Sequence, residues 1–311
     1  MDLFLRESIT DVLQISKGRP STDYTTKSKD SSKALQTVTI TLITKTVSLR
    51  QTQIFSNLCY NCFISECMSV NGTKVKQLEV SDSKLVFVTP EKQVFFMDIT
   101  KENPLGGTAQ LMVGNLHQID VGDGWIVGSS IGEKAFYRGG ITAENWKGTG
   151  WDSFGTAYVI YVAVGDGKVI GIKGNDFHVW KRKYGDTYWQ NFDTSGDFRQ
   201  ISIGDGKILG VNKNNEVFYR SGVDDADIFG TGWNLLDGVQ LKQVDVGYGR
   251  IAGVDASGQV WHRWGISPSQ PSGKGWRKTR AGFFQHVSCG DGILFCVDEK
   301  GNICICQTDD Y

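Results

Sequence analysis

The sequence has few of the features that mark several common classes of protein. Its 33 basic and 34 acidic residues leave a net charge of −1, so no charge excess directs it to nucleic acid or to an anionic membrane. No apolar run approaches the roughly 20 residues needed to cross a bilayer, the longest being Ala157–Val164. Proline is scarce (5 residues), and no long helical apolar stripe is present. We expect neither a nucleic-acid-binding protein nor a membrane-spanning one.

Glycine, in contrast, is abundant (38 residues) and recurs at fixed intervals. The motif "VGDG" and an altered copy, "VSDS", repeat at intervals of 41, 43, 39, 43 and 43 residues. The first glycine of the motif, or its serine replacement, stands at Ser81, Gly122, Gly165, Gly204, Gly247 and Gly290. Three residues earlier stand Leu78, Ile119, Val162, Ile201, Val244 and Val287, and four residues later Leu85, Ile126, Val169, Ile208, Ile251 and Leu294. Because both positions are aliphatic in every copy, the chain contains a structural repeat.

Each copy reads as the same succession of short strands. An alternating run such as Lys242–Gly247 indicates a half-buried strand, and the Asp-Gly or Tyr-Gly that ends it indicates a tight hairpin. A second apolar run, a polar turn and a third strand such as Val217–Arg220 follow, and a fourth strand begins at a tryptophan. Four strands in about 40–45 residues are typical of a propeller blade. The sequence predicts an all-β, six-bladed β-propeller of four-stranded antiparallel blades.

Residues 1–63 match no part of this repeat. Ser21–Lys33 is polar, charged and poor in aromatic residues, so it cannot bury enough apolar surface to become ordered. The first ten residues lack the basic region, apolar core and cleavage site of a secretory signal. We expect 1–63 to be a disordered or loosely attached extension and 64–311 to form the propeller.

Little in the repeat supports catalysis. The glycine-rich stretch Gly148–Trp151 resembles a nucleotide-binding loop, but no helical pattern follows it. The four histidines fall at different positions of the repeat, and none pairs with a repeated acid or nucleophile: His117, His178, His262 and His286. The turn aspartate recurs at Asp82, Asp123, Asp166, Asp205 and Asp291. Turn geometry explains it, because Asp tolerates the left-handed conformation and bonds its own turn. We expect no enzyme and no cofactor.

Two groups of residues contain side chains of the kinds that bind metal ions. Asp224, Asp225 and Asp227 lack the ligand spacing of a known calcium loop. Cys59 and Cys62 have a zinc-like spacing, but no suitable second pair lies downstream. We therefore predict no metal site.

An arginine ends the third strand of four copies, and a tryptophan opens the fourth strand. The pairs are Arg138 with Trp151, Arg182 with Trp189, Arg220 with Trp233 and Arg263 with Trp276, at separations of 13, 7, 13 and 13 residues. Antiparallel pairing of the two strands would bring each arginine close to its tryptophan. Such a pair could lock the outer edge of a blade by stacking. It could also form a sugar platform, since an aromatic face packs on a pyranose ring. The sequence leaves both readings open.

The sixth copy ends after its third strand, at Asn302–Cys306, so its fourth strand must come from elsewhere. Glu66–Gly72 fits, because Cys67 precedes Ser81 by 14 residues, as three of the tryptophans precede their glycines. Cys67 then takes the tryptophan position and Cys306 the arginine position. We expect the N-terminal strand to complete the last blade, with a Cys67–Cys306 disulfide in an oxidising compartment. Cys296 and Cys304 are a second candidate pair, and Cys59, Cys62 and Cys289 have no evident partner.

The repeats resemble those of the tectonin family. The resemblance is carried by Leu241–Trp276, by Arg199–Val223 and by the C-terminal Phe284–Asp310, and it covers about residues 67–311. The chain is most similar to fish-egg lectins and to horseshoe-crab lectins that bind lipopolysaccharide. This resemblance implies a secreted propeller that binds glycans, of the N-acetylglucosamine type or from lipopolysaccharide, on glycoproteins or microbial surfaces in innate defence. The competing interpretation is an intracellular, protein-binding propeller of the tectonin type.

Overall fold

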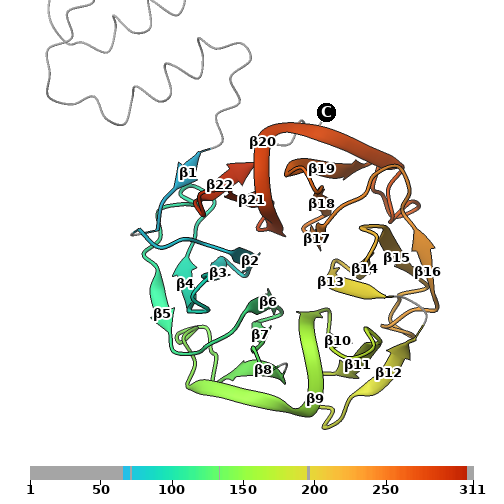
Figure 1. Ribbon diagram of the computed structural model, residues 1–311, viewed down its shortest axis with the longest axis horizontal. Helices are drawn as coiled ribbons and strands as arrows, with labels where there is room; N and C mark the ends of the chain where they lie inside the picture. The colour runs from blue at the N-terminus through green and yellow to red at the C-terminus, as the bar shows by residue number, and fades with distance from the viewer. Residues whose placement is uncertain (1–65, 71, 133, 195–196, 307–311) are drawn as a thin grey trace, which may run out of the picture. The chain divides into compact units, whose positions relative to one another are not determined.

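The computed structural model describes residues 66–70, 72–132, 134–194 and 197–306. The expected extension, 1–63, lies outside these residues. The described residues form strands and no helix, as the sequence predicts. The strands make two sheets of seven and two of four, which are arranged around a central axis (Figure 1).

The strands follow the expected succession of four, and each set of four antiparallel strands is called a unit here. Unit 1 contains β2 (Gln77–Ser81), β3 (Lys84–Val88), β4 (Val94–Asp98) and β5 (Gln110–Met112). Unit 2 contains β6 (Gln118–Gly122), β7 (Trp125–Ser129), β8 (Lys134–Gly139) and the first half of β9 (Gly150–Gly165). Unit 3 contains the rest of β9, β10 (Lys168–Lys173), β11 (Val179–Lys183) and β12 (Gln190–Asp193).

The second half of the chain repeats this arrangement. Unit 4 contains β13 (Phe198–Gly204), β14 (Lys207–Asn212), β15 (Val217–Ser221) and β16 (Gly232–Leu235). Unit 5 contains β17 (Gln243–Gly247), β18 (Arg250–Val254), β19 (Gln259–Trp264) and the first half of β20 (Gly275–Gly290). Unit 6 contains the rest of β20, β21 (Ile293–Asp298), β22 (Ile303–Cys306) and β1 (Cys67–Met68).

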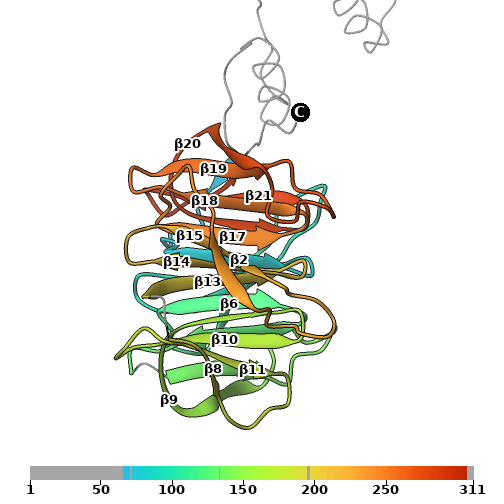
Figure 2. The ribbon, with the colours of Figure 1, turned by 90° about the vertical axis from the view of Figure 1, so that its right-hand side faces the viewer.

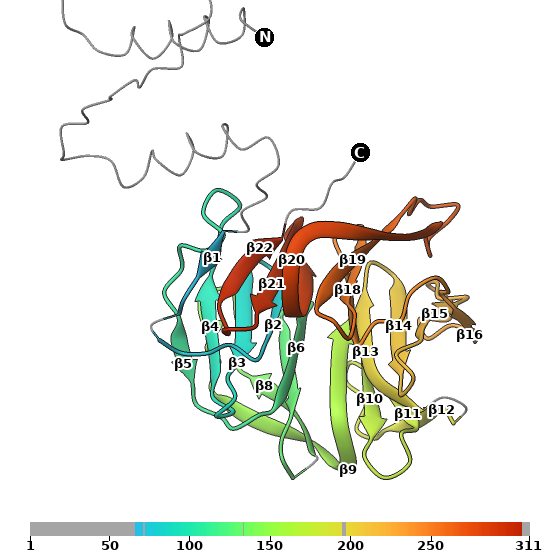
Figure 3. The same ribbon diagram turned by 45° about the horizontal axis from the view of Figure 1, so that its top comes forward.

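Two long strands join neighbouring units into the seven-stranded sheets. β9 pairs with β8 along its first half and with β10 along its second, and β20 pairs with β19 and β21 in the same way. Figure 3 shows β20 bending from one neighbour to the other. In the side view of Figure 2, the first strands of units 1, 2, 4 and 5 run along the central axis.

The aliphatic positions of the repeat form the core between the units. All twelve residues at the two predicted aliphatic positions are at most 1 % exposed. They belong to successive clusters that each contain residues of adjacent units, as where Val121 and Ile126 of unit 2 pack with Val86 and Val88 of unit 1. Each Å² of apolar surface that is buried stabilises the fold by about 25 cal/mol, so this packing is a main source of stability.

The first strand of each unit has one edge that no other strand covers, and in four units a glutamine side chain of the preceding unit forms hydrogen bonds with it. Gln118 Nε2 donates to the Val162 carbonyl at 2.8 Å, and Gln118 Oε1 accepts the Val162 amide at 3.0 Å. Gln77, Gln200 and Gln243 make the same pair of bonds to Ile119, Val244 and Val287 of the following unit. Unit 3 has Tyr161 and unit 6 has His286 at this position. A buried strand edge therefore obtains its hydrogen bonds from side chains.

The turn aspartates hold neighbouring units together, which corrects part of the prediction. Their φ values lie between 49° and 53°, so the left-handed conformation is as expected. Their carboxylates, however, accept amide hydrogens from the next unit's turn and not from their own. The amides are those of Gly124, Gly167, Gly206, Gly249 and, from Asp291 of unit 6 back to unit 1, Ser83. Asp291 also accepts the Tyr248 hydroxyl at 2.6 Å, where tyrosine replaces the aspartate.

Three carboxyl groups lie two positions before the glycine position of the turn; Glu79 is buried, and Asp120 and Asp245 are half-buried. Asp120 accepts the Val164 amide at 2.7 Å, and Asp245 accepts the Cys289 amide at 2.6 Å. Desolvation raises the pKa of Asp120 and of Glu79 well above their usual values, and it raises the pKa of Asp245 to about 6. His286 Nε2 is 3.5 Å from Glu79 Oε1, and burial lowers the pKa of His286 to about 3.

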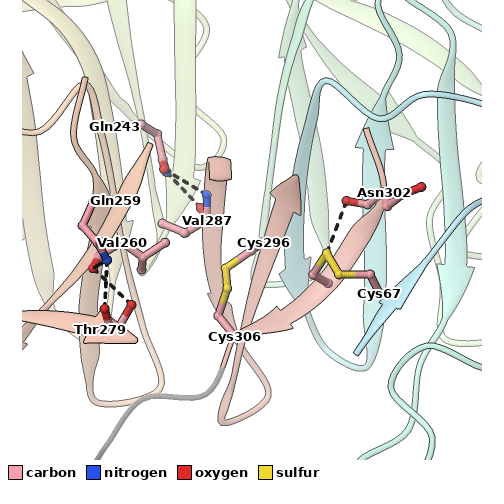
Figure 4. The surroundings of a disulfide bond; sticks show 10 residues. Cys67, Gln243, Gln259, Val260, Thr279, Val287, Cys296, Asn302 and Cys306 are labelled. Atoms are coloured by element: carbon pink, nitrogen blue, oxygen red, sulfur yellow. Dashed lines mark hydrogen bonds between the residues drawn. A yellow bond between two sulfur atoms is a disulfide. The ribbon is translucent and has the colours of Figure 1, made fainter. Parts of the chain in front are cut away.

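The cysteines confirm a disulfide at β1, but the predicted pairing is wrong. The bonds are Cys67–Cys304 and Cys296–Cys306, instead of the expected Cys67–Cys306 and Cys296–Cys304 (Figure 4). β1 pairs with β22 so that Cys67 lies opposite Cys304, with their Cα atoms 4.0 Å apart. In units 2, 4 and 5, the residue at the tryptophan position lies opposite the arginine position. β1 is thus displaced by two residues, which leaves Cys306 to Cys296.

Cys289 is the remaining cysteine of unit 6. Cys289 is buried and has no disulfide partner among the described residues. Its neighbours in the apolar cluster include the Cys296–Cys306 pair. Cys59 and Cys62 lie outside the described residues.

The amides of Val80 and Ser83 in unit 1 bond Ser288 and Asp291 of unit 6, so both chain ends contribute to one junction.

The raised pKa of Asp245 predicts a pH dependence of stability. The pKa of Asp245 is higher in the folded state, about 6, than in the unfolded state, about 3.9. The contribution of Asp245 to the free energy of unfolding is therefore highest below pH 4, and it falls as the pH rises through the folded pKa. Relative to Asp245→Asn, the wild-type protein should lose about 2–3 kcal/mol of unfolding free energy between pH 4 and pH 7. Denaturant unfolding at four pH values measures the difference.

The Asn variant serves as the control for titrating groups that do not interact with Asp245. The charge of Asp245 raises the pKa of Glu79 and of Asp120, so these two carboxyls add to the difference in the same direction. His286 acts in the opposite direction, because its lowered pKa makes protonation destabilising as the pH falls, and it does so in both proteins. A difference between the two proteins that stays constant from pH 4 to pH 7 would contradict the desolvation of Asp245.

Candidate functional site

The four predicted Arg–Trp pairs are brought together. Arg138, Arg220 and Arg263 lie directly opposite Trp151, Trp233 and Trp276 on paired strands. Arg182 is the second-to-last residue of β11, and Trp189 immediately precedes β12. The guanidinium carbon lies 5.2–5.6 Å from the centre of the indole ring in all four pairs, within the range of a cation–π contact.

Three of the four arginines hold in place the connections that follow the third strands. Their exposed fractions are only 6–9 %. The Nε atoms of Arg138, Arg220 and Arg263 donate to carbonyls within those connections, namely Lys147 O at 2.7 Å, Phe229 O at 3.1 Å and Ser272 O at 2.6 Å. Arg138 Nη1 also donates to Val113 O, and Arg220 contacts Asp193, both in the preceding unit. The stacking interpretation thus has direct structural support.

The tryptophans keep part of their surface in solvent. Trp151 Nε1 donates to Val113 O at 2.7 Å, and Trp276 Nε1 donates to Leu236 O at 3.4 Å. Within the described residues, the buried Nε1 atoms of Trp189 and Trp233 have no acceptor. Since all four side chains are half-buried, their contact with a ligand remains a prediction.

Unit 3 differs from the others because its connection is short. Six residues separate Arg182 from Trp189, whereas twelve separate each of the other pairs. A cavity of about 410 Å³ opens beside this connection, between units 2 and 3. It is lined by Trp125, Tyr137, Ser153, Phe154, Gly155, Val169, Arg182, Lys183, Tyr184, Gly185, Asp186 and Thr187, and we call it the Tyr184 cavity.

Aromatic rings form one wall of the Tyr184 cavity. Tyr184 stacks on Trp125 with ring centres 4.9 Å apart and an interplanar angle of 22°. Trp125 contacts Tyr137 at 5.4 Å, and Tyr137 contacts Phe154 at 4.9 Å. Phe154 in turn meets the edge of Trp189 at 5.8 Å. The predicted site residue Trp189 therefore lies behind this wall.

Polar groups surround the aromatic wall. The Tyr184 hydroxyl donates to Asp123 Oδ2 at 3.0 Å, which fixes the ring against the turn of unit 2. Burial raises the pKa of Tyr184, so the hydroxyl stays protonated. Arg182 contributes its guanidinium, and burial lowers its pKa without removing its charge near neutral pH. Asp186 Oδ2 accepts the Lys183 amide at 2.9 Å.

Trp125, Tyr137 and Tyr184 were not among the sequence-predicted site residues. Two signals for them exist in the sequence. Trp125 stands at a repeat position that is otherwise Lys84, Lys168, Lys207, Arg250 and Ile293. The shortened connection is the second signal, and it carries Tyr184. The two departures from the repeat lie in different units, and only the fold brings them together.

The residues considered as metal ligands have other roles where they are described. Asp224 Oδ1 accepts the amides of Ala226 and Asp227, and Asp227 Oδ1 accepts that of Phe229, so these two carboxylates shape a turn. Cys67, Asp298 and Cys304 lie close together, but both cysteines belong to the disulfide.

Solved structures with a similar backbone are β-propellers. The WD40 β-propeller domain of Doa1 has 13 % identity and a TM-score of 0.53, with 79 % of this chain and 97 % of that chain covered. YCF48 bound to a D1 peptide has 11 % identity and a TM-score of 0.52, with 80 % and 98 % covered. YCF48 from Cyanidioschyzon merolae has 10 % identity and a TM-score of 0.50, with 78 % and 85 % covered. At these identities the likeness shows the fold alone, and the chain is a β-propeller protein.

The sequence comparison supports a particular kind of propeller. Residues 160–299 match the family model of the Tectonin domain, which supports the tectonin-repeat family. This segment spans most of unit 3, units 4 and 5, and two of the four strands of unit 6, the second half of β20 and β21. A comparison with curated protein sequences gave no match. The described part of the chain has no helix that is long and apolar enough to cross a membrane.

The hydrogen bonds of the arginines predict unequal costs of substitution. Arg220→Met removes bonds to two carbonyls and the contact with Asp193, so it should lower the free energy of unfolding by about 2–4 kcal/mol. Arg182→Met removes one bond, to Phe154 O at 3.3 Å, and should cost about 1–2 kcal/mol. Urea unfolding of both variants tests this ranking. Equal losses would mean that the connection carbonyls contribute nothing.

Proposed function

We propose that this chain is a lectin, a non-enzymatic protein that binds glycans. In this proposal the units are the six blades of a propeller, and β1 closes the ring by completing the last blade. The pairing of β1 with β22 and the bonds from unit 6 to unit 1 support that closure. The tectonin match supports the family in which such a function is expected.

The Tyr184 cavity is the observation that carries the proposal. Its volume, about 410 Å³, lies within the range of small-molecule sites, roughly 300–1,000 Å³. Half-buried Trp125, Tyr137 and Tyr184 offer aromatic surface to the C–H groups of a pyranose ring. Ser153, Arg182 and Asp186 place polar atoms around it for the hydroxyl groups. Aromatic surface with a few polar groups is what a sugar site requires.

The Arg–Trp pairs of units 2, 4 and 5 are proposed as weaker contacts. Their tryptophans are half-buried, and their arginines hold the adjacent connections. Weak sites repeated around a ring gain strength on a dense glycan surface by avidity. Two disulfides are compatible with the extracellular location that recognition of glycoproteins or microbial surfaces in innate defence requires.

A second candidate function is protein binding. One similar propeller, YCF48, has been solved with a D1 peptide bound, so a ring of this shape accommodates a peptide in that protein. An intracellular, protein-binding tectonin propeller is therefore the alternative to a lectin. Reduced cysteines and a cytosolic pool of the protein would favour it.

A glycan array at high density tests the lectin proposal. The wild-type protein should bind a subset of glycans, and Thr187→Trp should lose most of that signal, because the indole fills the Tyr184 cavity. Thr187 is exposed and lines the cavity, and Thr187→Ser is the matched control that should bind as wild type does. Silence of the wild-type protein across all glycans would refute a lectin. Undiminished binding by a folded Thr187→Trp protein would place the site elsewhere.

A further inference from the structure

The four connections after the third strands differ in one hydrogen bond. In units 2, 4 and 5, a carbonyl of the connection accepts the arginine Nε hydrogen at 2.6–3.1 Å. In unit 3 the connection is six residues shorter, and Arg182 donates to a single acceptor among the described residues, Phe154 O at 3.3 Å. The shorter connection therefore leaves Arg182 without the carbonyl that the other three arginines bind.

The Tyr184 cavity lies where that acceptor is missing. Its lining contains Arg182 and the five residues that follow, Lys183–Thr187, which form nearly the whole short connection. The guanidinium also faces two rings, with its central carbon 4.8 Å from the centre of Phe154 and 5.6 Å from that of Trp189. The side chain of Arg182 is buried, and its packing against these two rings holds the guanidinium in place. A ligand oxygen in the cavity would take the place of the absent carbonyl.

The charges around the cavity indicate what kind of oxygen that is. Arg182 and Lys183 are cationic, and Asp186 is the one acidic residue in the lining. Asp186 already accepts the Lys183 amide, whereas the Lys183 side chain is exposed. The charges of the lining residues sum to +1. Asp186 also attracts Arg182 electrostatically, and Asp123, outside the lining, accepts the Tyr184 hydroxyl. A guanidinium binds a carboxylate through charge-assisted, frequently bidentate hydrogen bonds, roughly twice as strong as neutral ones.

We propose that the Tyr184 cavity binds an acidic monosaccharide unit, a pyranose that carries a carboxylate. The carboxylate takes the place of the connection carbonyl on Arg182, and Lys183 adds a second cation. The sugar ring packs on the aromatic wall of Trp125, Tyr137 and Tyr184. This inference rests on the proposed lectin function and names the class of sugar at its principal site.

Isothermal titration with four small probes tests the inference. D-glucuronate should bind at least roughly tenfold more tightly than D-glucose, because a hydrogen-bonded charge pair is added to the same ring. N-acetylglucosamine, whose amide oxygen is neutral, should bind no better than glucose. Acetate should show no measurable binding, since it lacks the ring. Raising the salt concentration should weaken glucuronate binding and leave glucose binding nearly unchanged.

Variants locate the effect on the cavity. Arg182→Met should abolish the preference for glucuronate over glucose, and Lys183→Met should reduce glucuronate affinity roughly threefold. Lys183 is exposed and its side chain makes no hydrogen bond to described residues, so this second variant decides the matter if Arg182→Met fails to fold. Lys300 is another exposed lysine, in the β21–β22 turn, and Lys300→Met is the matched control that should titrate as wild type does.

The outcomes separate this inference from the proposed function. Glucose or N-acetylglucosamine binding as tightly as glucuronate would overturn the acidic-sugar assignment and leave the lectin proposal intact. Acetate, or a peptide with a free carboxyl terminus, binding as tightly as glucuronate would show that the cavity recognises a carboxylate without a sugar. Failure of every sugar, together with a silent glycan array, would remove both.

Discussion

The uncovered edge of each unit's first strand is the constraint on which the rest of this structure depends. That edge faces the next unit in a buried place, where backbone amides and carbonyls need partners. Paired bonds from Gln118 and the other repeated glutamines supply them, and the turn aspartates do the same at the ends of these strands. The glutamine recurs in four of the six units and the turn aspartate in five, at the spacing of the repeat, because these units satisfy their neighbours in the same way. Unit-to-unit geometry is thereby fixed near the axis, and the outer connections are free to vary.

Variation in those outer connections is what creates a candidate site. Where the connection is long, its carbonyl meets the buried arginine, and the Arg–Trp pair serves the stability of the unit. Where it is short, the same arginine remains in place beside a cavity. Trp125 and Tyr184 then stack to form one aromatic wall of this cavity. The principal site is proposed at the position where the repeat is broken, because in units 2, 4 and 5 the arginine Nε already bonds a carbonyl of the connection.

The sequence predicted well what depends on local pattern. Alternation and the Asp-Gly turns gave the strands, and the separation of Arg220 from Trp233 placed that pair correctly, because adjacent strands joined by one connection must lie side by side. The sequence analysis did not predict the features that depend on contacts between units. The turn aspartates bond a neighbour about 40 residues away, and the two-residue β1 sets its own register, which changed the disulfide pairing. The Tyr184 cavity requires two departures from the repeat to meet in space, which spacing along one chain does not reveal.

Replacement of the short connection tests the central claim most directly. The six residues between Arg182 and Trp189 are exchanged for the twelve between Arg220 and Trp233, which gives unit 3 the connection of unit 4. The account predicts a folded protein at least as stable as wild type, because Arg182 regains a backbone acceptor, together with loss of glycan binding on the array. A folded variant that binds glycans as wild type does would contradict the account.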